Sequence, residues 1–382
     1  MRFHFYIAPH EVYNDAVIYL AEGLRELGVS FSASRDFWQQ EPAGGDFLFR
    51  HDPAIRPDEC DVIVFSTYWF NYVDPVTFQA TGAAMPVGLT TANRRHRLML
   101  LDPDDGYKTT GWRPEFRAFD LVLRPKYNRR TFNPANTVPW VLGMASRVLR
   151  ATADGPPFAS RERVIVQNFG FTHGYVHGVR RAALERLLPK LATVWPLDTR
   201  QTPAGEVPAD PWAQLMWRQT QQKHNPGYYD QLRQSQCVAC FCGDFIPGLP
   251  FDPSSSLVGG GKARLRHRFY RVLSRALGRT DRIIQWDSWR FWESLAAGSV
   301  ALHVDLEKYG VELPVMPVNW THYVGFDFEH LERDVARFLA LDPVALSRIA
   351  AAGWQWALDH YAPAASARRC LDLLRQLPPP HA

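Results

Sequence analysis

Residues 285–298 read QWDSWRFWESLAAG, and residues 300–304 read VALHV. Ser288 is a residue type favoured at helix N-caps, and Gly298 is the type favoured just after a helix ends. The apolar run that follows is short and rich in valine and leucine, so we expect it to form a buried strand. The stretch therefore predicts a loop, a helix and a strand in succession, which is the repeating unit of an α/β fold.

The start of this predicted helix has the chemistry of a diphosphate-binding site. The first backbone N–H groups of a helix lack partners within it and lie at the positive end of its dipole, so they bind phosphate readily. Ser288 and Arg290 can add direct phosphate contacts. Glu293 follows one turn later, where its carboxylate can accept two hydroxyl protons, as from a ribose. We therefore predict a nucleotide site here, at the point where the loop containing Gln285 leads into the helix.

The rest of the second half alternates strand and helix patterns. We expect strands over 164–166 and 237–242, the second leading to Gly243, and helices over 179–191, 331–340, 343–360 and 364–374. The loop after the first of these strands can approach a phosphate closely and donate hydrogen bonds to it through Gly170, Thr172 and His173. An ordinary βα turn is the alternative for this loop.

The first half opens with strand, helix and strand. We expect strands over 2–8, 61–66, 97–101 and 120–123, and a helix from Asn14 or Asp15 to Gly28. Between the halves, residues 152–163 contain glycine, prolines and charges, which is typical of a linker. The alternation predicts an α/β protein with two Rossmann-like domains.

Size and composition agree with this organisation. The chain has 382 residues, more than one hydrophobic core usually supports. It has no apolar run of about 18 residues, so a membrane-spanning helix is not expected. Its five cysteines are odd in number, which argues against a secreted disulfide scaffold and favours the cytoplasm. The net charge of +4 argues against a dedicated nucleic-acid binder.

The order of these features resembles GT-B glycosyltransferases, especially the exostosin-like and CgeB-like families with a glycosyltransferase group 1-type C-terminal domain. The resemblance rests on Ser288-x-Arg290-x-x-Glu293-x-Leu295-Ala296-Ala297-Gly298 before a strand, on Tyr229-x-x-Leu232-x-x-Ser235 before Gly243, and on the tail from Gly353 to Tyr361 with its following helix. It covers the C-terminal half well and the N-terminal half only generically.

The resemblance implies two Rossmann-like domains facing a cleft. Residues 1–151 would form the acceptor domain, 152–163 the linker and 164–361 the donor domain, and 362–382 would include a helix that crosses back onto the first domain. The implied reaction moves a sugar from a nucleotide-sugar donor to a hydroxyl of a glycan, a lipid-linked acceptor or a small molecule. Neither a cofactor nor a nucleic-acid partner is expected. A divalent metal is not required, because the helix dipole and Arg290 can stabilise the leaving diphosphate.

The resemblance also assigns roles to residues. The donor-binding residues would be Gln285, Ser288, Arg290, Glu293, Gly170, Thr172, His173 and Gly243. On the acceptor side, the residue types themselves make Tyr68 and Trp69 candidates for stacking on a sugar, with core packing as the alternative, and Asp15 is a further acceptor-binding candidate. Retaining enzymes of this fold commonly have Glu-x7-Glu, and Gln285 stands where the first glutamate would fall, which favours an inverting mechanism.

An inverting transfer needs a general base from the first domain. Strand C-terminal loops are where α/β sheets bind ligands, so acidic and histidine side chains in those loops are the candidates. We rank Asp105 and Asp104 first and His10 next. Asp74 and Glu11 are further members of the same loops.

Three alternatives stay open. Asp102-Pro103-Asp104 is also an Asp-x-Asp sequence, which in GT-A glycosyltransferases binds a divalent metal. The chain could instead be a nucleotide-sugar epimerase or hydrolase on the same fold. It could also be a non-catalytic subunit that binds sugar nucleotides or glycans. The run Cys237-x-x-Cys240-x-Cys242 lies in an apolar strand pattern, which favours buried thiols over a zinc site.

The segment 262–279 has an unusual charge pattern. It contains one lysine and six arginines interleaved with apolar residues, and no acidic residue. A solvated surface helix is one interpretation. Contact with the inner-membrane surface, near a lipid-linked acceptor, is the other.

Overall fold

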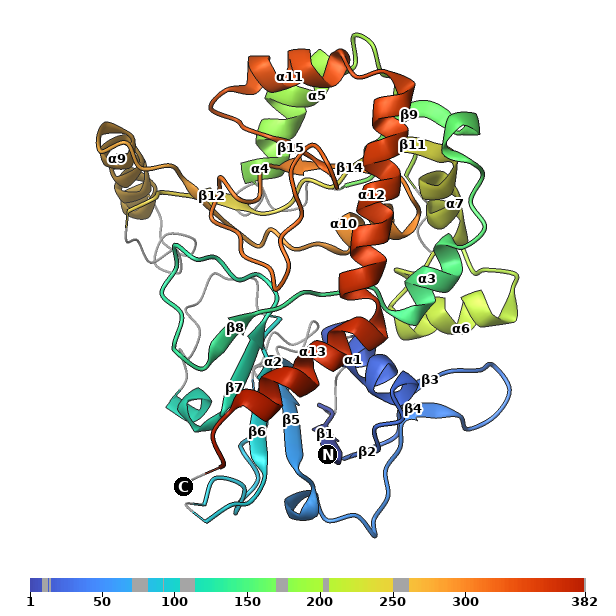
Figure 1. Cartoon of the computed structure of the whole chain (residues 1–382), viewed down its shortest axis with the longest axis vertical. Helices are drawn as coiled ribbons and strands as arrows, with labels where there is room; N and C mark the ends of the chain where they lie inside the picture. The colour runs from blue at the N-terminus through green and yellow to red at the C-terminus, as the bar shows by residue number, and fades with distance from the viewer. Residues whose placement is uncertain are drawn as a thin grey trace.

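The computed structural model describes residues 1–8, 13, 15–70, 82–91, 93–103, 114–169, 178–201, 206–249 and 261–380. In this part of the chain, each half forms one parallel sheet with helices around it (Figure 1). None of the helices described there combines the length and the apolar run that crossing a membrane requires.

The first sheet has six parallel strands in the order β2-β1-β5-β6-β7-β8. They are β1 (Phe3–Tyr6), β2 (Phe31–Ala33), β5 (Val62–Ser66), β6 (Arg97–Leu101), β7 (Leu121–Arg124) and β8 (Thr137–Pro139). The strands β5, β6 and β7 are buried throughout or nearly so, as expected where both faces of a parallel sheet are covered. The three predicted inner strands are confirmed, and β1 is shorter than the predicted run 2–8.

Helices and a small hairpin complete the first half. They are α1 (Asp15–Glu26), η1 (Pro57–Glu59), α2 (Thr67–Phe70), η2 (Pro114–Ala118), α3 (Ser146–Thr152) and the antiparallel pair β3 (Phe37–Gln39) and β4 (Phe47–Phe49). The helix α1 matches the predicted first helix. The hairpin and β8, whose strands have three residues each, were not predicted.

The second sheet has five parallel strands in the order β10-β9-β11-β14-β15. They are β9 (Glu162–Val166), β10 (Leu197–Asp198), β11 (Ser235–Ala239), β14 (Val300–Val304) and β15 (Val324–Phe326). The predicted strand 300–304 is confirmed as β14. The predicted strand 237–242 is wrong in its bounds: β11 starts two residues earlier and ends at Ala239.

The helices of the second half surround this sheet. They are η3 (Phe158–Ser160), α4 (Gly178–Ala182), η4 (Ala183–Leu187), α5 (Leu188–Leu191), α6 (Pro211–Gln219), α7 (Pro226–Gln234), α9 (Gly261–Ala276), α10 (Trp289–Ala296), α11 (Leu331–Leu339), α12 (Pro343–Tyr361) and α13 (Pro363–Gln376). A further antiparallel pair consists of β12 (Asp244–Ile246) and β13 (Arg282–Ile284).

The last helix returns to the first half of the chain. Figure 1 shows α13 lying across α1, beside the first sheet. Gly23 of α1 makes this approach possible, because a Cβ there would lie 2.0 Å from the carbonyl oxygen of Pro363. Arg97 at the start of β6 donates to the carbonyl oxygens of Leu377 and Pro378 at 3.0 and 2.7 Å. The predicted crossing of the C-terminal helix is therefore confirmed.

The predicted domain boundaries stay a prediction. The first sheet ends at Pro139 and the second begins at Glu162. The segment between them contains α3 and η3, and thus covers most of the predicted linker 152–163.

Candidate functional site

Helix α10 begins where the two halves of the chain meet. Ser288 is its N-cap residue, with φ −135° and ψ 149°, and Gly298 follows its end with φ +68°. At this N-terminus the rings of Trp289 and Tyr13 meet edge to face, with centroids 5.0 Å apart. Because Tyr13 belongs to the loop after β1, the start of α10 lies at a carboxyl edge of the first sheet, where α/β folds bind ligands.

Asp287 fixes the loop that enters α10. Its carboxylate accepts from the backbone N–H of Leu142 at 2.7 Å and from the indole Nε1–H of Trp292 at 2.6 Å. Burial raises the pKa of Asp287 to about 6, although these two hydrogen bonds oppose the shift. Since Leu142 lies between β8 and α3, this side chain holds the start of α10 against the first half of the chain.

Ser288 has a buried hydroxyl that the described part of the protein leaves without a hydrogen bond. It does not cap its own helix either. A buried hydroxyl without a partner costs about 1–3 kcal/mol. A phosphate oxygen at the helix start would satisfy this hydroxyl together with the first N–H groups of α10.

Arg290 connects α10 to the loop that follows β9. Its Nε–H donates to the carbonyl oxygen of Asn168 at 2.8 Å. The predicted anion-binding residues Gly170, Thr172 and His173 lie outside the described residues. Asn168 is only two positions before Gly170, so the structure places Arg290 beside the start of that loop.

Glu293 lies deeper than its predicted role suggests. It is 5% exposed, and its two carboxylate oxygens accept from the hydroxyls of Tyr228 and Tyr229 at 2.9 and 3.1 Å. Burial, and next the charge of Glu293, raise the pKa of Tyr228 well above its usual value. The ribose contact stays a prediction, and the structure adds two internal partners that the sequence did not reveal.

Arg147 of α3 joins this cluster from the first half of the chain. It is 3% exposed, and it donates to the hydroxyls of Tyr13 and Tyr229, both at 2.6 Å. Its guanidinium also lies 4.8 Å from the ring centroid of Tyr13. Burial, and next the charge of Arg147, lower the pKa of His224 to about 3, so that this neighbour is neutral. Nothing in the local sequence around Arg147 indicated this role.

Gln285 and Gly243 occupy unusual backbone conformations. Gln285 has φ +51°, a left-handed conformation that residues with a Cβ seldom adopt and that costs about 1–3 kcal/mol. Gly243 has φ +96°, and a Cβ there would lie 2.2 Å from the carbonyl oxygen of Ile284. The chain leaving β11 at Gly243 therefore packs directly on β13, the strand that precedes Gln285. The segments that contain these two predicted donor residues thus lie side by side.

The predicted acceptor residues differ in exposure. Tyr68 on α2 is 40% exposed. Trp69 donates from Nε1 to the carbonyl oxygen of Ala84 at 3.0 Å and packs against Tyr6, with centroids 5.2 Å apart. Trp69 therefore has a clear packing role beside any acceptor contact. Asp15 is the first residue of α1, and its side chain lies outside the description.

The three predicted catalytic residues Asp105, Asp104 and His10 lie outside the described residues, as do Glu11 and Asp74. Asp102, the first residue of the Asp-x-Asp sequence, is 1% exposed, with its Oδ2 3.8 Å from Nη1 of Arg124. This pairing is typical of a buried structural ion pair and disfavours Asp102 as a metal ligand. Within the described ranges, no three histidine, cysteine or acidic side chains gather as a metal site would require.

The cysteines of the Cys237-x-x-Cys240-x-Cys242 run are free and buried. Cys240 Sγ lies 2.9 Å from Oγ of Ser294 on α10. Burial raises the pKa of the Cys240 thiol to about 12, so it stays protonated. The three cysteines are buried thiols, as predicted, and Cys240 packs between β11 and α10.

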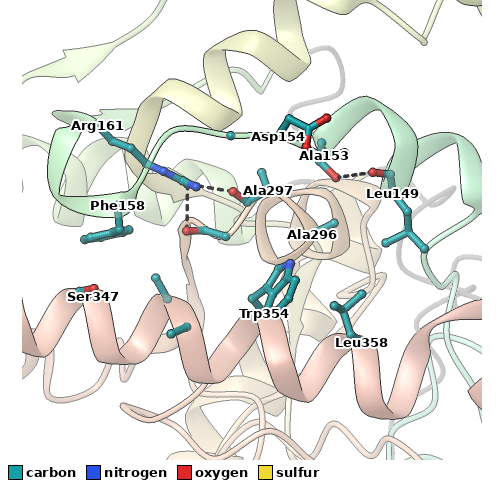
Figure 2. A pocket seen from close by; sticks show the side chains of 15 residues that line it. Leu149, Ala153, Asp154, Phe158, Arg161, Ala296, Ala297, Ser347, Trp354 and Leu358 are labelled. Carbon is teal, nitrogen blue, oxygen red and sulfur yellow. Dashed lines mark hydrogen bonds between the residues drawn. The ribbon is translucent and has the colours of Figure 1, made fainter.

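A cavity of about 510 Å³ lies at the other end of α10, between η3 and α12 (Figure 2). Nη1 of Arg161 donates there to the carbonyl oxygens of Ala297 and Gly298 at 2.8 and 2.9 Å. The helix has eight residues, so this end lies about 12 Å from Ser288. Because a helix C-terminus is the negative end of the dipole, the cavity does not suit a diphosphate.

No protein-family model matches the sequence, and no curated protein matches it. Solved structures match over nearly the whole chain. An alpha-glucosyltransferase in complex with UDP is 9% identical with a TM-score of 0.51, covering 98% of this chain and 100% of that chain. The alpha-glucosyltransferase in complex with UDP-glucose and DNA containing an abasic site is 10% identical with a TM-score of 0.52, at the same coverage. A glycosyltransferase from Rickettsia africae ESF-5 is 10% identical with a TM-score of 0.48, covering 98% of each chain.

At this level of identity, the two alpha-glucosyltransferase structures show the fold alone. That fold has two Rossmann-like domains in the GT-B arrangement, and the two parallel sheets of this chain agree with it. The predicted fold class is therefore confirmed.

Proposed function

We propose that the chain is a glycosyltransferase that moves a sugar from a nucleotide-sugar donor to an acceptor hydroxyl. The N-terminus of α10 carries this proposal. There the buried hydroxyl of Ser288 has no partner among the described residues, beside N–H groups that a helix cannot satisfy itself. The same fold belongs to an alpha-glucosyltransferase solved with UDP.

The diphosphate of the donor would lie against Ser288 and Arg290. Charge develops on this diphosphate as the bond to the sugar breaks, and fixed N–H dipoles with an arginine stabilise it. The loop containing Gly170, Thr172 and His173 would cover the phosphates, since Arg290 already contacts Asn168 at its start. This arrangement needs no metal ion to neutralise the leaving group.

Glu293 would accept the ribose hydroxyls of the nucleotide. A carboxylate has about four acceptor positions, and the two tyrosine hydroxyls occupy only two of them. Tyr228 and Tyr229 would then orient the carboxylate for the nucleotide. Gly243 and Gln285 complete the proposed donor side.

The transfer is proposed to invert the anomeric configuration. Gln285 offers a neutral amide where retaining relatives of this fold commonly have a carboxylate, so no charge there would stabilise the donor sugar. Asp105, Asp104 or His10 would deprotonate the acceptor hydroxyl, and Tyr68, Trp69 and Asp15 would contact the acceptor.

The test is release of nucleoside diphosphate from a panel of nucleotide sugars, with and without glycan, lipid-linked and small-molecule acceptors. We expect release that depends on an acceptor, and a product of opposite anomeric configuration by proton NMR. A product of unchanged configuration would overturn the inverting mechanism alone. No release with any donor and acceptor pair would overturn the proposed activity.

The same assay separates the alternatives. Release of free sugar without acceptor indicates a hydrolase, and a changed sugar on an intact donor indicates an epimerase. Binding without turnover indicates a non-catalytic subunit.

The exostosin-like or CgeB-like subgroup and the cytoplasm are parts of the same proposal. All five cysteines are buried and free, which suits a reducing compartment.

A further inference from the structure

Helix α9 presents an unusual face to solvent. Figure 1 shows it at the edge of the molecule, beyond β12. Ser274 is buried and its Oγ accepts from the backbone N–H of Leu249 at 3.2 Å, while Arg271 donates to the carbonyl oxygen of Phe245 at 2.9 Å. These contacts, with Tyr270 packed against Ile246 and Ile284, identify the side of α9 that faces the protein.

The opposite side of α9 is apolar and exposed. Leu265 is 70% exposed, Phe269 63% and Val272 65%. Their spacing of four and then three residues places them in one stripe on a helix of about 3.6 residues per turn. A helix on the surface of a water-soluble domain normally turns such a stripe toward the core. Here the stripe points away from the body of the protein.

Positive charge accompanies this stripe. Between Asp252 and Asp281 there is no acidic residue, and the cationic residues are Lys262, Arg264, Arg266, Arg268, Arg271, Arg275 and Arg279. Arg268 and Arg279 are exposed. On a helical projection Arg268 adjoins Val272, so a guanidinium group borders the apolar stripe, while Arg279 follows the end of the helix at Ala276.

We propose that α9 docks the protein on an anionic lipid membrane. The helix would lie along the surface with Leu265, Phe269 and Val272 in the interfacial region and arginines on the lipid phosphates. A second copy of this chain is a poor occupant, because two such helices would repel each other. Nucleic acid would pair with the arginines but would leave the apolar stripe in water.

Docking on a membrane would also restrict the class of acceptor that the site can reach. If the chain transfers sugar as proposed, this docking favours a lipid-linked acceptor over a soluble glycan or a small molecule. The membrane contact itself does not depend on that activity, so it is tested without donor or acceptor.

The experiment is co-sedimentation of the full chain with vesicles of phosphatidylcholine alone or mixed with phosphatidylglycerol. We expect binding only to the anionic vesicles, weakened by salt. Leu265→Gln with Phe269→Gln should lower the vesicle affinity by about tenfold or more. Arg268→Gln and Arg279→Gln should each lower it roughly fivefold. Val344→Gln, at an apolar position on α12 that is 64% exposed, is the matched control and should bind like the wild type.

Several outcomes would overturn the proposal. These are equal binding to both kinds of vesicle, unchanged binding by the double variant, tighter binding to duplex DNA than to anionic vesicles, or a wild-type dimer in size-exclusion chromatography that the double variant abolishes.

Discussion

At the residue scale, the buried Glu293 has two roles that mutations can separate. One is to hold the hydroxyls of Tyr228 and Tyr229 inside the protein, and the other is the proposed contact with the ribose. Alanine at 293 would leave two tyrosine hydroxyls without their acceptor, so it would confuse a loss of folding with a loss of binding. Conservative changes avoid this problem.

We expect Tyr228→Phe to lower the free energy of unfolding by about 1 kcal/mol, because it removes one hydrogen bond. Nucleotide affinity should change only slightly. Glu293→Gln should lower nucleotide affinity by about tenfold or more, because a charged acceptor is lost. Urea unfolding and calorimetric titration measure the two effects. Equal affinity losses in both variants would contradict the ribose role and leave Glu293 as a packing residue.

The raised pKa of Asp287 predicts that the free energy of unfolding falls as the pH rises. Its pKa is raised to about 6 in the folded protein, so the folded state binds a proton more tightly than the unfolded chain does. The stability that this group contributes is present below about pH 4 and is lost as the pH rises to about 6.

Relative to Asp287→Asn, the wild-type free energy of unfolding should therefore fall by about 2 kcal/mol between about pH 4 and pH 6, and level off above about pH 7. Urea unfolding of both proteins across this range checks it. A difference that is constant or rises with pH would refute the burial of this carboxyl group.

Long-range clusters such as Arg147, Tyr229 and Glu293 could not be predicted from the sequence. Arg147 and Tyr229 are 82 positions apart, and Tyr229 and Glu293 are 64 apart. Each is an ordinary residue in its own helix, and only the packing of α3, α7 and α10 brings them together. Ser288 and Arg290 could be predicted, because a helix start is a local pattern.

At the element scale, local signals explain which helices were predicted. The bounds of α10 follow from a serine at the N-cap position and a terminal glycine, and β14 follows from an uninterrupted apolar run. The helices α6 and α7 were missed although each starts with a cap residue followed by proline. The side chain of Asp210 accepts from Ala213 N–H, and that of Asn225 accepts from Gly227 N–H.

The packing of α13 on α1 yields a prediction at this scale. Gly23→Ala would place a Cβ 2.0 Å from the Pro363 carbonyl oxygen and 2.9 Å from Cβ of Ala367, so the two helices must separate. We expect the free energy of unfolding to fall by about 1–3 kcal/mol. Gly45→Ala is the matched control, since its Cβ would have nothing within 4 Å. If both variants unfold alike, α13 does not brace the first half as described.

At the scale of the whole molecule, the start of α10 lies between the two sheets. The loop after β1 supplies Tyr13, the segment after β8 supplies Leu142, and α3 supplies Arg147. The alternating pattern of strands and helices predicted both sheets, because each buried strand is a local apolar run. That the two halves meet at the N-terminus of α10 was implied only by the family resemblance. No local residue pattern determines how two domains pack against each other.

The central claim is that the N-terminus of α10 binds the diphosphate of a nucleotide. Isothermal titration of UDP, GDP and ADP into the wild type, Ser288→Ala, Arg290→Ala and Arg348→Ala tests it most directly. Arg348 is exposed on α12 and serves as the control. The account predicts that at least one nucleotide binds the wild type and the control equally, and binds each α10 variant about tenfold more weakly. No binding by any nucleotide, or equal binding by all four proteins, would contradict it.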